Sequence, residues 1–206
     1  GAVRAYAHRY AVRPGQRALV TGGAAGIGLA TARLLAAGGA RLALLDIDAL
    51  RLDEAAAELR GGGAEVVTIV ASVAEPGEVR DAFAGLDTRW GGLDILVNNA
   101  GVIGKRAALD LTDEAWSRVM RINLDGVFFC AREAGRRMVA QRSGAIVNLG
   151  SIYSRVAAPE RLAYCASKAA VAAITKVLAI EWARHGVRVN AVAPGVILWP
   201  EGEAWN

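Results

Sequence analysis

Tyr164 and Lys168 stand four residues apart and are the pair of side chains in this sequence best suited to acid–base chemistry. On a helix this spacing places both side chains on one face, within reach of a common ligand. A free tyrosine has a pKa of about 10, which is too high for a general base at neutral pH, and a neighbouring cation lowers it. The pair therefore predicts a phenol that Lys168 tunes for proton transfer. Taken alone, the spacing also arises by chance on many helices.

A glycine-rich turn near the start of the chain indicates a second chemical function. Residues 21–28 read TGGAAGIG and lie between a short apolar run and an amphipathic stretch. Glycines let the backbone turn tightly and approach a pyrophosphate, while the helix that follows supplies N–H donors and the positive end of its dipole. The turn predicts a nucleotide-binding site, although many glycine-rich segments are merely flexible loops.

A carboxylate follows at the spacing expected for a dinucleotide site. Asp46 ends the next apolar run and lies 18 residues after Gly28 (46 − 28 = 18), where a carboxylate accepts hydrogen bonds from an adenosine ribose. It would repel a 2′-phosphate, and no arginine immediately follows it. Asp46 therefore favours NAD over NADP. The alternative role, a helix cap, suits Asp48 better.

The elements that must position these residues alternate between short apolar runs and longer amphipathic stretches, which is typical of parallel strands joined by helices. We predict strands at Ala18–Thr21, Leu42–Asp46, Val66–Val70, Ile95–Asn98, Ala145–Leu149 and Val187–Ala193. We predict helices at Ile27–Ala37, Ala49–Arg60, Pro76–Trp90, Asp113–Gln141 and Leu162–Arg184. The pattern indicates an α/β protein with a doubly wound parallel sheet whose ligands bind at the carboxyl ends of the strands.

Composition and charge exclude several classes of protein. No apolar run approaches the roughly 18 residues that span a bilayer, and no export signal is visible at the start of the sequence. The net charge of +4 comes from dispersed basic residues, so we expect no nucleic-acid or membrane partner. Cys130 and Cys165 have no C-x-x-C or histidine-rich neighbourhood, so we expect no metal and a reducing, cytoplasmic location.

Three motifs together resemble the short-chain dehydrogenase/reductase family. They are the TGxxxGxG turn at residues 21–28, the sequence NNAG at residues 98–101 and the YxxxK pair at residues 164–168. The resemblance covers Arg17 to about Ile197 and implies a Rossmann fold, a nicotinamide cofactor and a single domain over residues 16–206. Residues 1–15 are expected to form a loosely attached N-terminal arm.

The resemblance also implies a set of cofactor-binding residues. In relatives, Lys168 holds the hydroxyls of the nicotinamide ribose, and a Pro-Gly loop closes over the nicotinamide. One departure is the end of the third strand, where relatives often carry an aspartate and this chain has Ser72 and Val73. The cofactor-binding residues expected are Gly22, Ala25, Gly26, Ile27, Gly28, Asp46, Ser72, Val73, Asn99, Ala100, Gly101, Tyr164, Lys168, Pro194, Gly195 and Ile197.

The same resemblance assigns four catalytic residues, Asn123, Ser151, Tyr164 and Lys168. Ser151 precedes Tyr164 by 13 residues (164 − 151 = 13), matches the family arrangement and would hydrogen-bond the substrate oxygen. Asn123 would hold a water that links Lys168 to solvent. The expected reaction is hydride transfer between NAD(H) and a secondary alcohol or ketone of the sugar, polyol, hydroxy-acid or 3-oxoacyl type. The long helices at Asp113–Gln141 and Leu162–Arg184 resemble those that pair subunits, so we expect a homodimer or homotetramer.

Two alternatives remain open. Relatives continue for several tens of residues past the Pro-Gly loop, so the fold is expected to be truncated after the sixth strand, without the usual substrate segment and last strand. A nucleotide-binding module without turnover is therefore one alternative. Residues 195–201 resemble bacterial pteridine reductases, which makes an NADPH reductase the other. Ala24, Ala25 and Asp46 argue against it, because those enzymes carry a basic residue in the glycine-rich turn.

Overall fold

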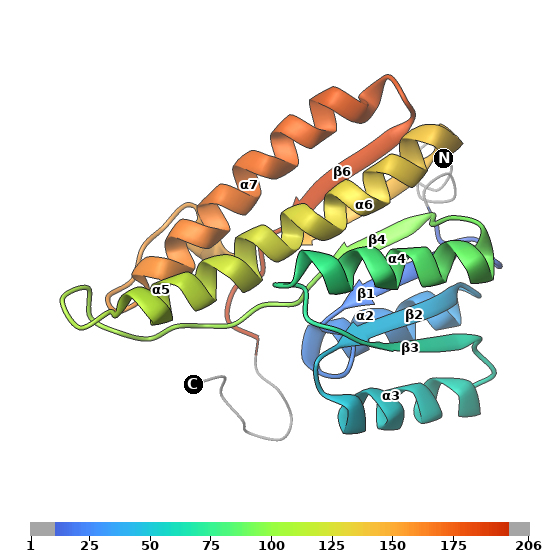
Figure 1. Cartoon of the computed structure of the whole chain (residues 1–206), viewed down its shortest axis with the longest axis horizontal. Helices are drawn as coiled ribbons and strands as arrows, with labels where there is room; N and C mark the ends of the chain where they lie inside the picture. Colours follow the sequence, from blue (N-terminus) through green and yellow to red (C-terminus); the bar gives the residue numbers. More distant parts are fainter. Residues whose placement is uncertain (1–10, 198–206) are drawn as a thin grey trace, which may run out of the picture.

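The computed structural model describes residues 11–197 of the chain. The first ten residues of the expected N-terminal arm, the stretch Trp199–Glu201 and the terminal Trp205-Asn206 lie outside the described residues. Short Val/Ile/Leu-rich segments form a parallel sheet in the order β3-β2-β1-β4-β5-β6 (Figure 1). Its strands are β1 (Arg17–Thr21), β2 (Arg41–Asp46), β3 (Val66–Val70), β4 (Ile95–Asn98), β5 (Gly144–Leu149) and β6 (Val187–Val192).

The segments between the strands form helices, as the hydrophobic spacing predicts. They are α2 (Gly26–Ala37), α3 (Ala49–Gly61), α4 (Pro76–Trp90), α5 (Asp113–Met120), η1 (Arg121–Asp125), α6 (Gly126–Gln141), η2 (Ile152–Ser154) and α7 (Leu162–Ala183). The prediction of a doubly wound parallel sheet is confirmed, and the predicted strand bounds agree with the structure to within one residue.

The strand order reverses between β1 and β4, the two central strands. The chain moves outward from β1 through β2 to β3, returns to β4 beside β1, and then moves outward through β5 to β6. Thr21 and Asn98 are paired at the last position of this central contact. Loops that leave the two strands diverge to opposite faces, so a crevice opens at the carboxyl edge, where doubly wound sheets bind ligands.

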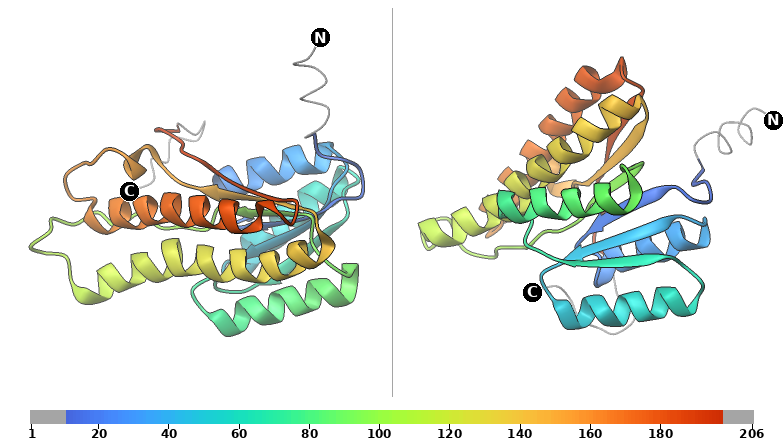
Figure 2. Two further views of the ribbon diagram at one scale, coloured as in Figure 1. Left: turned by 90° about the horizontal axis from the view of Figure 1, so that it is seen from above. Right: turned by 45° about the vertical axis from the view of Figure 1, so that its right-hand side comes forward.

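Each face of the sheet carries its own apolar core. One core lies against α4, α6 and α7, and its largest fully buried side chains include Phe83, Leu96 and Met138. The other lies against α2 and α3 and includes Leu35, Leu42 and Leu52. Figure 2 shows the sheet between the two helical layers. Because both faces of its inner strands are covered, those strands read as continuous apolar runs.

The predicted helix over Asp113–Gln141 is interrupted. Residues 121–125 form one π-helical turn between α5 and α6, in which Gly126 N–H bonds the carbonyl of Arg121. The extra residue in this turn rotates Asn123 into the protein, where its side chain is fully buried. Hydrophobic periodicity cannot reveal a single inserted residue, so the prediction of one continuous α-helix was wrong here.

The helix α7 carries more apolar surface than the sequence reading anticipated. A window of 18 residues within it is apolar enough to cross a membrane by length and composition alone. In the fold, however, it packs along β6 and η2, and Lys168 points inward with only 5% of its surface exposed. Only 28% of that window is buried, so within the described residues α7 packs by one face and leaves apolar side chains exposed on the other. Within the described residues, β6 forms one edge of the sheet.

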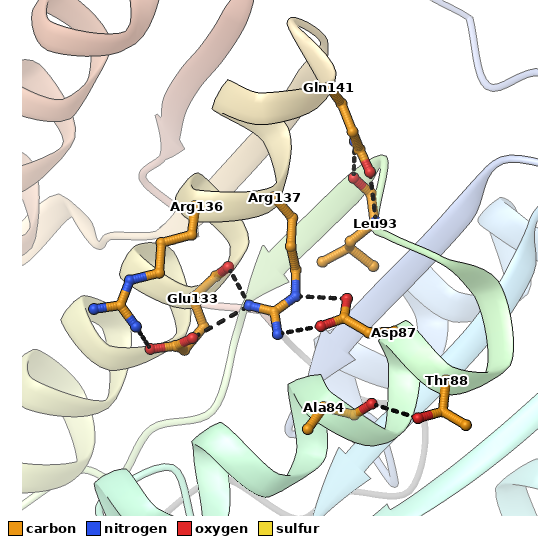
Figure 3. Close-up of polar contacts among 8 residues, drawn as sticks. All are labelled: Ala84, Asp87, Thr88, Leu93, Glu133, Arg136, Arg137 and Gln141. Atoms are coloured by element: carbon orange, nitrogen blue, oxygen red, sulfur yellow. Dashed lines mark hydrogen bonds and ion pairs between the residues drawn. The ribbon is translucent and has the colours of Figure 1, made fainter.

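A buried carboxylate joins α6 to α4. Glu133 has 6% of its side chain exposed, and Arg137 donates to it at 3.2 Å while also bonding Asp87 of α4 at 2.6 Å (Figure 3). The Arg137 guanidinium also lies 5.1 Å from the ring centre of Phe83. Arg136 bonds the same Glu133 at 2.8 Å, but 62% of its side chain is exposed. Arg137 is therefore the cation that links the two helices.

The difference in burial between the two arginines predicts different effects on stability. Arg137→Met should lower the free energy of unfolding by about 2 kcal/mol, since it removes charge-assisted bonds from a buried carboxylate. Arg136→Met is the matched control and should lower it by less than about 1 kcal/mol, because exposed ion pairs contribute little. Urea unfolding of both variants measures the difference, and equal losses would contradict the role assigned to Arg137.

Candidate active site

A cleft of about 600 Å³ opens at the carboxyl edge of the sheet. It is lined by the turn after β1, the ends of β2, β3 and β4, and the loops after β5 and β6. The structure brings most of the predicted site residues to this cleft: Gly22, Ala25, Ile27, Asp46, Ser72, Val73, Asn99, Ala100, Gly101, Ser151, Tyr164, Lys168, Pro194, Gly195 and Ile197. Gly26, Gly28 and Asn123 are not among the residues that line it.

The glycine-rich turn has a backbone that only small residues allow. Gly22 and Gly26 adopt left-handed φ angles of 62° and 56°. A Cβ on Gly28 would collide with the carbonyl oxygen of Gly22. The turn therefore folds back on the first residues of α2. This close contact holds the start of the helix near the end of β1.

The first turn of α2 has the free donors that a pyrophosphate requires. Its N-cap is Ala25, which has no side chain to accept a hydrogen bond from the helix N–H groups. These donors and the helix dipole face the cleft without a side-chain acceptor, which is the arrangement that binds phosphate groups. The residues present thus fit the pyrophosphate of a dinucleotide.

Asp46 lies at the end of β2 with its carboxylate held by the backbone. One oxygen accepts from Ile47 N–H at 2.8 Å, and the other accepts from Ala24 N–H at 3.2 Å, across the glycine-rich turn. The carboxylate lines the cleft in this position. Asp48 caps α3 by accepting from Arg51 N–H at 3.1 Å, so the helix-capping role falls to it as the sequence indicates.

Ser72, the residue in place of the family aspartate, is partly engaged by its own loop. Its hydroxyl accepts from Ala74 N–H at 3.2 Å, and its N–H donates to Glu78 at 2.7 Å. The hydroxyl proton remains available to a ligand. Val73 is buried beside it and packs close to Gly126.

The two asparagines of the NNAG sequence brace the sheet beneath the cleft. Asn99 donates from its amide to the carbonyls of Thr21 and Gly22, both at 3.0 Å. Asn98 donates to Asn148 of β5 at 2.9 Å, and Asn148 donates in turn to Thr175 of α7 at 2.9 Å. This chain of buried amides joins β4, β5 and α7 beneath the cleft.

Tyr164, Lys168 and Ser151 meet at the end of the cleft away from Asp46. Tyr164 and Lys168 share one face of α7, and the Lys168 ammonium lies 5.7 Å from the ring centre of Tyr164. The ammonium donates to the carbonyl of Leu149 at 2.6 Å. Ser151 caps η2 through Tyr153 N–H at 3.2 Å and also hydrogen-bonds Tyr164.

Burial decides the protonation of the pair. It raises the pKa of Tyr164 above its usual range, against the lowering effects of the Ser151 hydrogen bond and the Arg161 charge. Burial also lowers the pKa of Lys168 to about 8. The sequence predicted that Lys168 would lower the pKa of Tyr164. The lowering of the Tyr164 pKa by Lys168 stays a prediction: the Lys168 ammonium lies 5.7 Å from the ring centre of Tyr164 and donates to the carbonyl of Leu149.

Asn123 braces the loop after β4 rather than presenting its side chain to the cleft. Its amide oxygen accepts from Val102 N–H at 2.8 Å, and its amide nitrogen donates to the carbonyl of Val102 at 2.9 Å. The nitrogen also donates to Ser167 of α7 at 3.2 Å. The side chain is committed to these bonds and fixes the distance between the loop and α7.

Sequence reasoning missed two arginines that line the cleft, Arg118 on α5 and Arg161 at the start of α7. Arg161 precedes Tyr164 by three residues, and this helical spacing was a usable signal. Arg118 comes from a helix distant in sequence, so no local pattern indicates it. The supporting roles of Asn148 and Thr175 were likewise missed, because they depend on contacts between β5 and α7.

Comparison with known proteins places this geometry in a family. The family model described as short chain dehydrogenase matches residues 16–203. The chain is 46% identical over 185 residues to galactitol 2-dehydrogenase (L-tagatose-forming) of Cereibacter sphaeroides, an alignment that covers 89% of this chain and 72% of that protein.

Two solved structures are similar in fold as well as in sequence. A gluconate 5-dehydrogenase from Burkholderia cenocepacia in complex with NADP and tartrate is 39% identical with a TM-score of 0.85, covering 90% of this chain and 73% of that one. A xylitol dehydrogenase with bound NAD+ is 36% identical with a TM-score of 0.85, covering 88% and 70%.

The environment of Tyr164 predicts its titration in the absence of cofactor. Because burial disfavours the phenolate, the pKa of the Tyr164 phenol should lie above the value of about 10 for a free tyrosine. Less than half of the phenol should therefore be ionised at a pH of about 10. The difference in phenolate absorbance between the wild type and Tyr164→Phe isolates this group. Ser151→Ala should raise the midpoint further, because the Ser151 hydrogen bond lowers the pKa of the phenol. A midpoint well below 10 would contradict the assigned environment.

Proposed function

Since the chain belongs to the short-chain dehydrogenase/reductase family and is an NAD(P)-dependent oxidoreductase of secondary alcohols and ketones, we propose that it oxidises a polyol or a sugar acid with NAD. One observation carries the proposal. Ser151, Tyr164 and Lys168 gather at one end of a cleft whose other end holds the glycine-rich turn and Asp46.

The cofactor would lie along the edge of the sheet. The first turn of α2 would hold its pyrophosphate and Asp46 the adenosine ribose. Ser72 and Val73 would contact the adenine, and the backbone of Asn99, Ala100 and Gly101 would line the middle of the cleft. The further residues that would hold it are Tyr164, Lys168, Pro194, Gly195 and Ile197. When bound, the dinucleotide supplies the hydride acceptor.

The residues of the chain handle the substrate proton. Ser151 fixes the substrate oxygen by a hydrogen bond, and Tyr164 removes the hydroxyl proton in oxidation and returns it in reduction. The Ser151 bond and the Arg161 charge favour the phenolate against the effect of burial. Lys168, with a pKa of about 8, donates hydrogen bonds near the phenol and exchanges protons close to neutral pH.

Asn123 would act as a positioning residue. Its bonds to Val102 and Ser167 hold the loop after β4 at a fixed distance from α7, and Ser167 bonds the carbonyl of Tyr164 at 2.8 Å. The water relay expected for this position would therefore use the main chain of the π-helical turn rather than the Asn123 side chain.

The choice between NAD and NADP follows from charge at the end of β2. The Asp46 carboxylate lines the cleft and would accept from the ribose hydroxyls of NAD, whereas it would repel the 2′-phosphate of NADP. Ala24 and Ala25 offer no cation to that phosphate. The same residues weigh against a pteridine-reductase-like NADPH enzyme, and the assembled Ser151, Tyr164 and Lys168 weigh against a binding module without turnover.

We further propose a cytoplasmic homodimer or homotetramer. On α7, Val177 and Ile180 expose 52% and 79% of their surface, and Phe128 on α6 exposes 40%. Apolar groups on two long neighbouring helices suit helix packing between copies of the chain. This role for the outer face of α7 needs no membrane partner.

The catalytic roles predict distinct effects of two substitutions. Tyr164→Phe removes only the hydroxyl, so turnover should fall by about 100- to 10,000-fold while NAD affinity is retained. Lys168→Ala should lower turnover and also weaken NAD binding by about tenfold, because it removes a ribose ligand. Steady-state kinetics and calorimetric titration with NAD separate the two effects. Retained turnover with phenylalanine at position 164 would overturn the mechanism.

The role of Asp46 is tested by its charge. Asp46→Asn keeps one side-chain acceptor for NAD and removes the repulsion of a phosphate, so it should strengthen NADP binding by about tenfold with little loss of NAD affinity. Asp46→Ala should weaken NAD binding as well. Calorimetric titration of each variant with both cofactors measures these affinities, and a wild type that binds NADP at least as well as NAD would refute the assignment.

A further inference from the structure

The guanidinium of Arg161 contains a buried nitrogen without a partner. Its Nη1 atom is removed from solvent and makes no hydrogen bond within residues 11–197. A guanidinium stays charged at any physiological pH, and a buried charged donor without an acceptor costs free energy. The side chain as a whole is only partly buried and lines the cleft, so a ligand bound there can accept from the accessible part of the same guanidinium and balance its charge.

Arg161 lies on the same face of α7 as the catalytic pair. It is the N-cap residue of the helix, three residues before Tyr164 and seven before Lys168 (168 − 161 = 7). Side chains one helical turn apart have Cβ atoms about 5–6 Å apart. The positive charge of Arg161 also acts on the phenol, whose pKa it lowers. A small molecule with its hydroxyl at Tyr164 can therefore reach Arg161 with a neighbouring group.

The catalytic end of the cleft is cationic. Within the described residues, Asp46 is the one carboxylate that lines the cleft, and it lies at the end of β2, three strand spacings or roughly 14 Å from β5, which leads into Ser151. The cations that line the cleft are Arg118, Arg161 and Lys168. An anion at this end would meet three positive groups.

The nearest carboxylate in sequence does not neutralise Arg161. Glu160 is exposed and lies 3.9 Å from Lys105. Its backbone carbonyl accepts from Arg106 N–H at 2.9 Å, and its φ of 60° is a left-handed conformation that non-glycine residues adopt only at a cost. These contacts hold the start of α7 against the loop after β4 and fix the backbone from which Arg161 extends.

We propose that the substrate is a secondary alcohol that also carries an oxyanion, namely a carboxylate, phosphate or sulfonate, and that Arg161 binds this group while the hydroxyl lies at Tyr164. The planar guanidinium fork matches two oxygens of such a group. A neutral polyol would leave the charge of Arg161 unbalanced. This assignment rests on the proposed function and names the substrate class of that same site.

Matched pairs of alcohols test the assignment. The pairs are galactitol with galactonate, ribitol with ribitol phosphate, and propanediol with hydroxypropanesulfonate, so that each arm tests one oxyanion. The quantity measured is the ratio of kcat/KM for the anionic member to kcat/KM for the neutral member. The ratio cancels any effect of Arg161 on the pKa of Tyr164, because that effect acts on both members.

Arg161→Met should lower this ratio by about 10- to 100-fold for the oxyanion that the site binds, since it removes a charge-assisted pair. Arg161→Lys keeps the charge and should lower the ratio less. Arg155→Met is the matched control, because Arg155 is exposed on the preceding loop and does not line the cleft. It should leave the ratio unchanged.

Calorimetric titration of each pair into the protein saturated with NAD separates this assignment from the proposed function. The assignment is supported if an anionic member binds and its affinity falls at least tenfold in Arg161→Met, even if no pair is turned over. Absence of turnover would overturn only the proposed function. The assignment would be overturned if both members of every pair showed equal affinity and equal kcat/KM, or if Arg161→Met lowered these quantities equally for both members. If turnover is seen in that case, the proposed function still stands.

Discussion

Thr21 and Asn99 fasten the ends of β1 and β4 with hydrogen bonds from both side chains, and the cleft depends on this contact. The Asn99 amide donates to the carbonyls of Thr21 and Gly22, and the Thr21 hydroxyl accepts from the N–H groups of Asn99 and Ala100. The two chains are joined at the point where they diverge to opposite faces of the sheet. The glycine-rich turn and the loop after β4 thereby become two walls of one crevice.

Buried polar groups extend this contact toward the catalytic end. Asn98, Asn148 and Thr175 form a hydrogen-bonded chain from β4 through β5 to α7, and Asn123 and Ser167 form a second link to α7. Each group would be costly to bury alone, and each has a partner here. Such satisfied networks tolerate little displacement, so they hold α7 in the position that brings Tyr164 and Lys168 to the cleft.

The helix α7 shows how one element combines packing with chemistry. Leu178, Ala179 and Trp182 pack against the core of the sheet, while Tyr164 and Lys168 on another face enter the cleft. Burial has opposite consequences for the two groups, because it raises the pKa of the phenol and lowers that of the ammonium. With a pKa of about 8, Lys168 remains mostly protonated at neutral pH, and the Ser151 hydrogen bond and the Arg161 charge oppose the effect of burial on the phenol.

The sequence by itself determined the order of strands and helices, the glycine-rich turn, Asp46 and the spacing of Tyr164 and Lys168, because these depend on local periodicity and on residue types at short separations. Only the tertiary structure decided the π-helical turn at Asn123, the bonds that occupy the Asn123 side chain, and the direction of the Tyr164 pKa. It also decided that Arg161 has a buried nitrogen without a partner while Arg118 joins it from α5. Burial, desolvation and contacts between distant elements set these properties, and they exist only once the chain has folded.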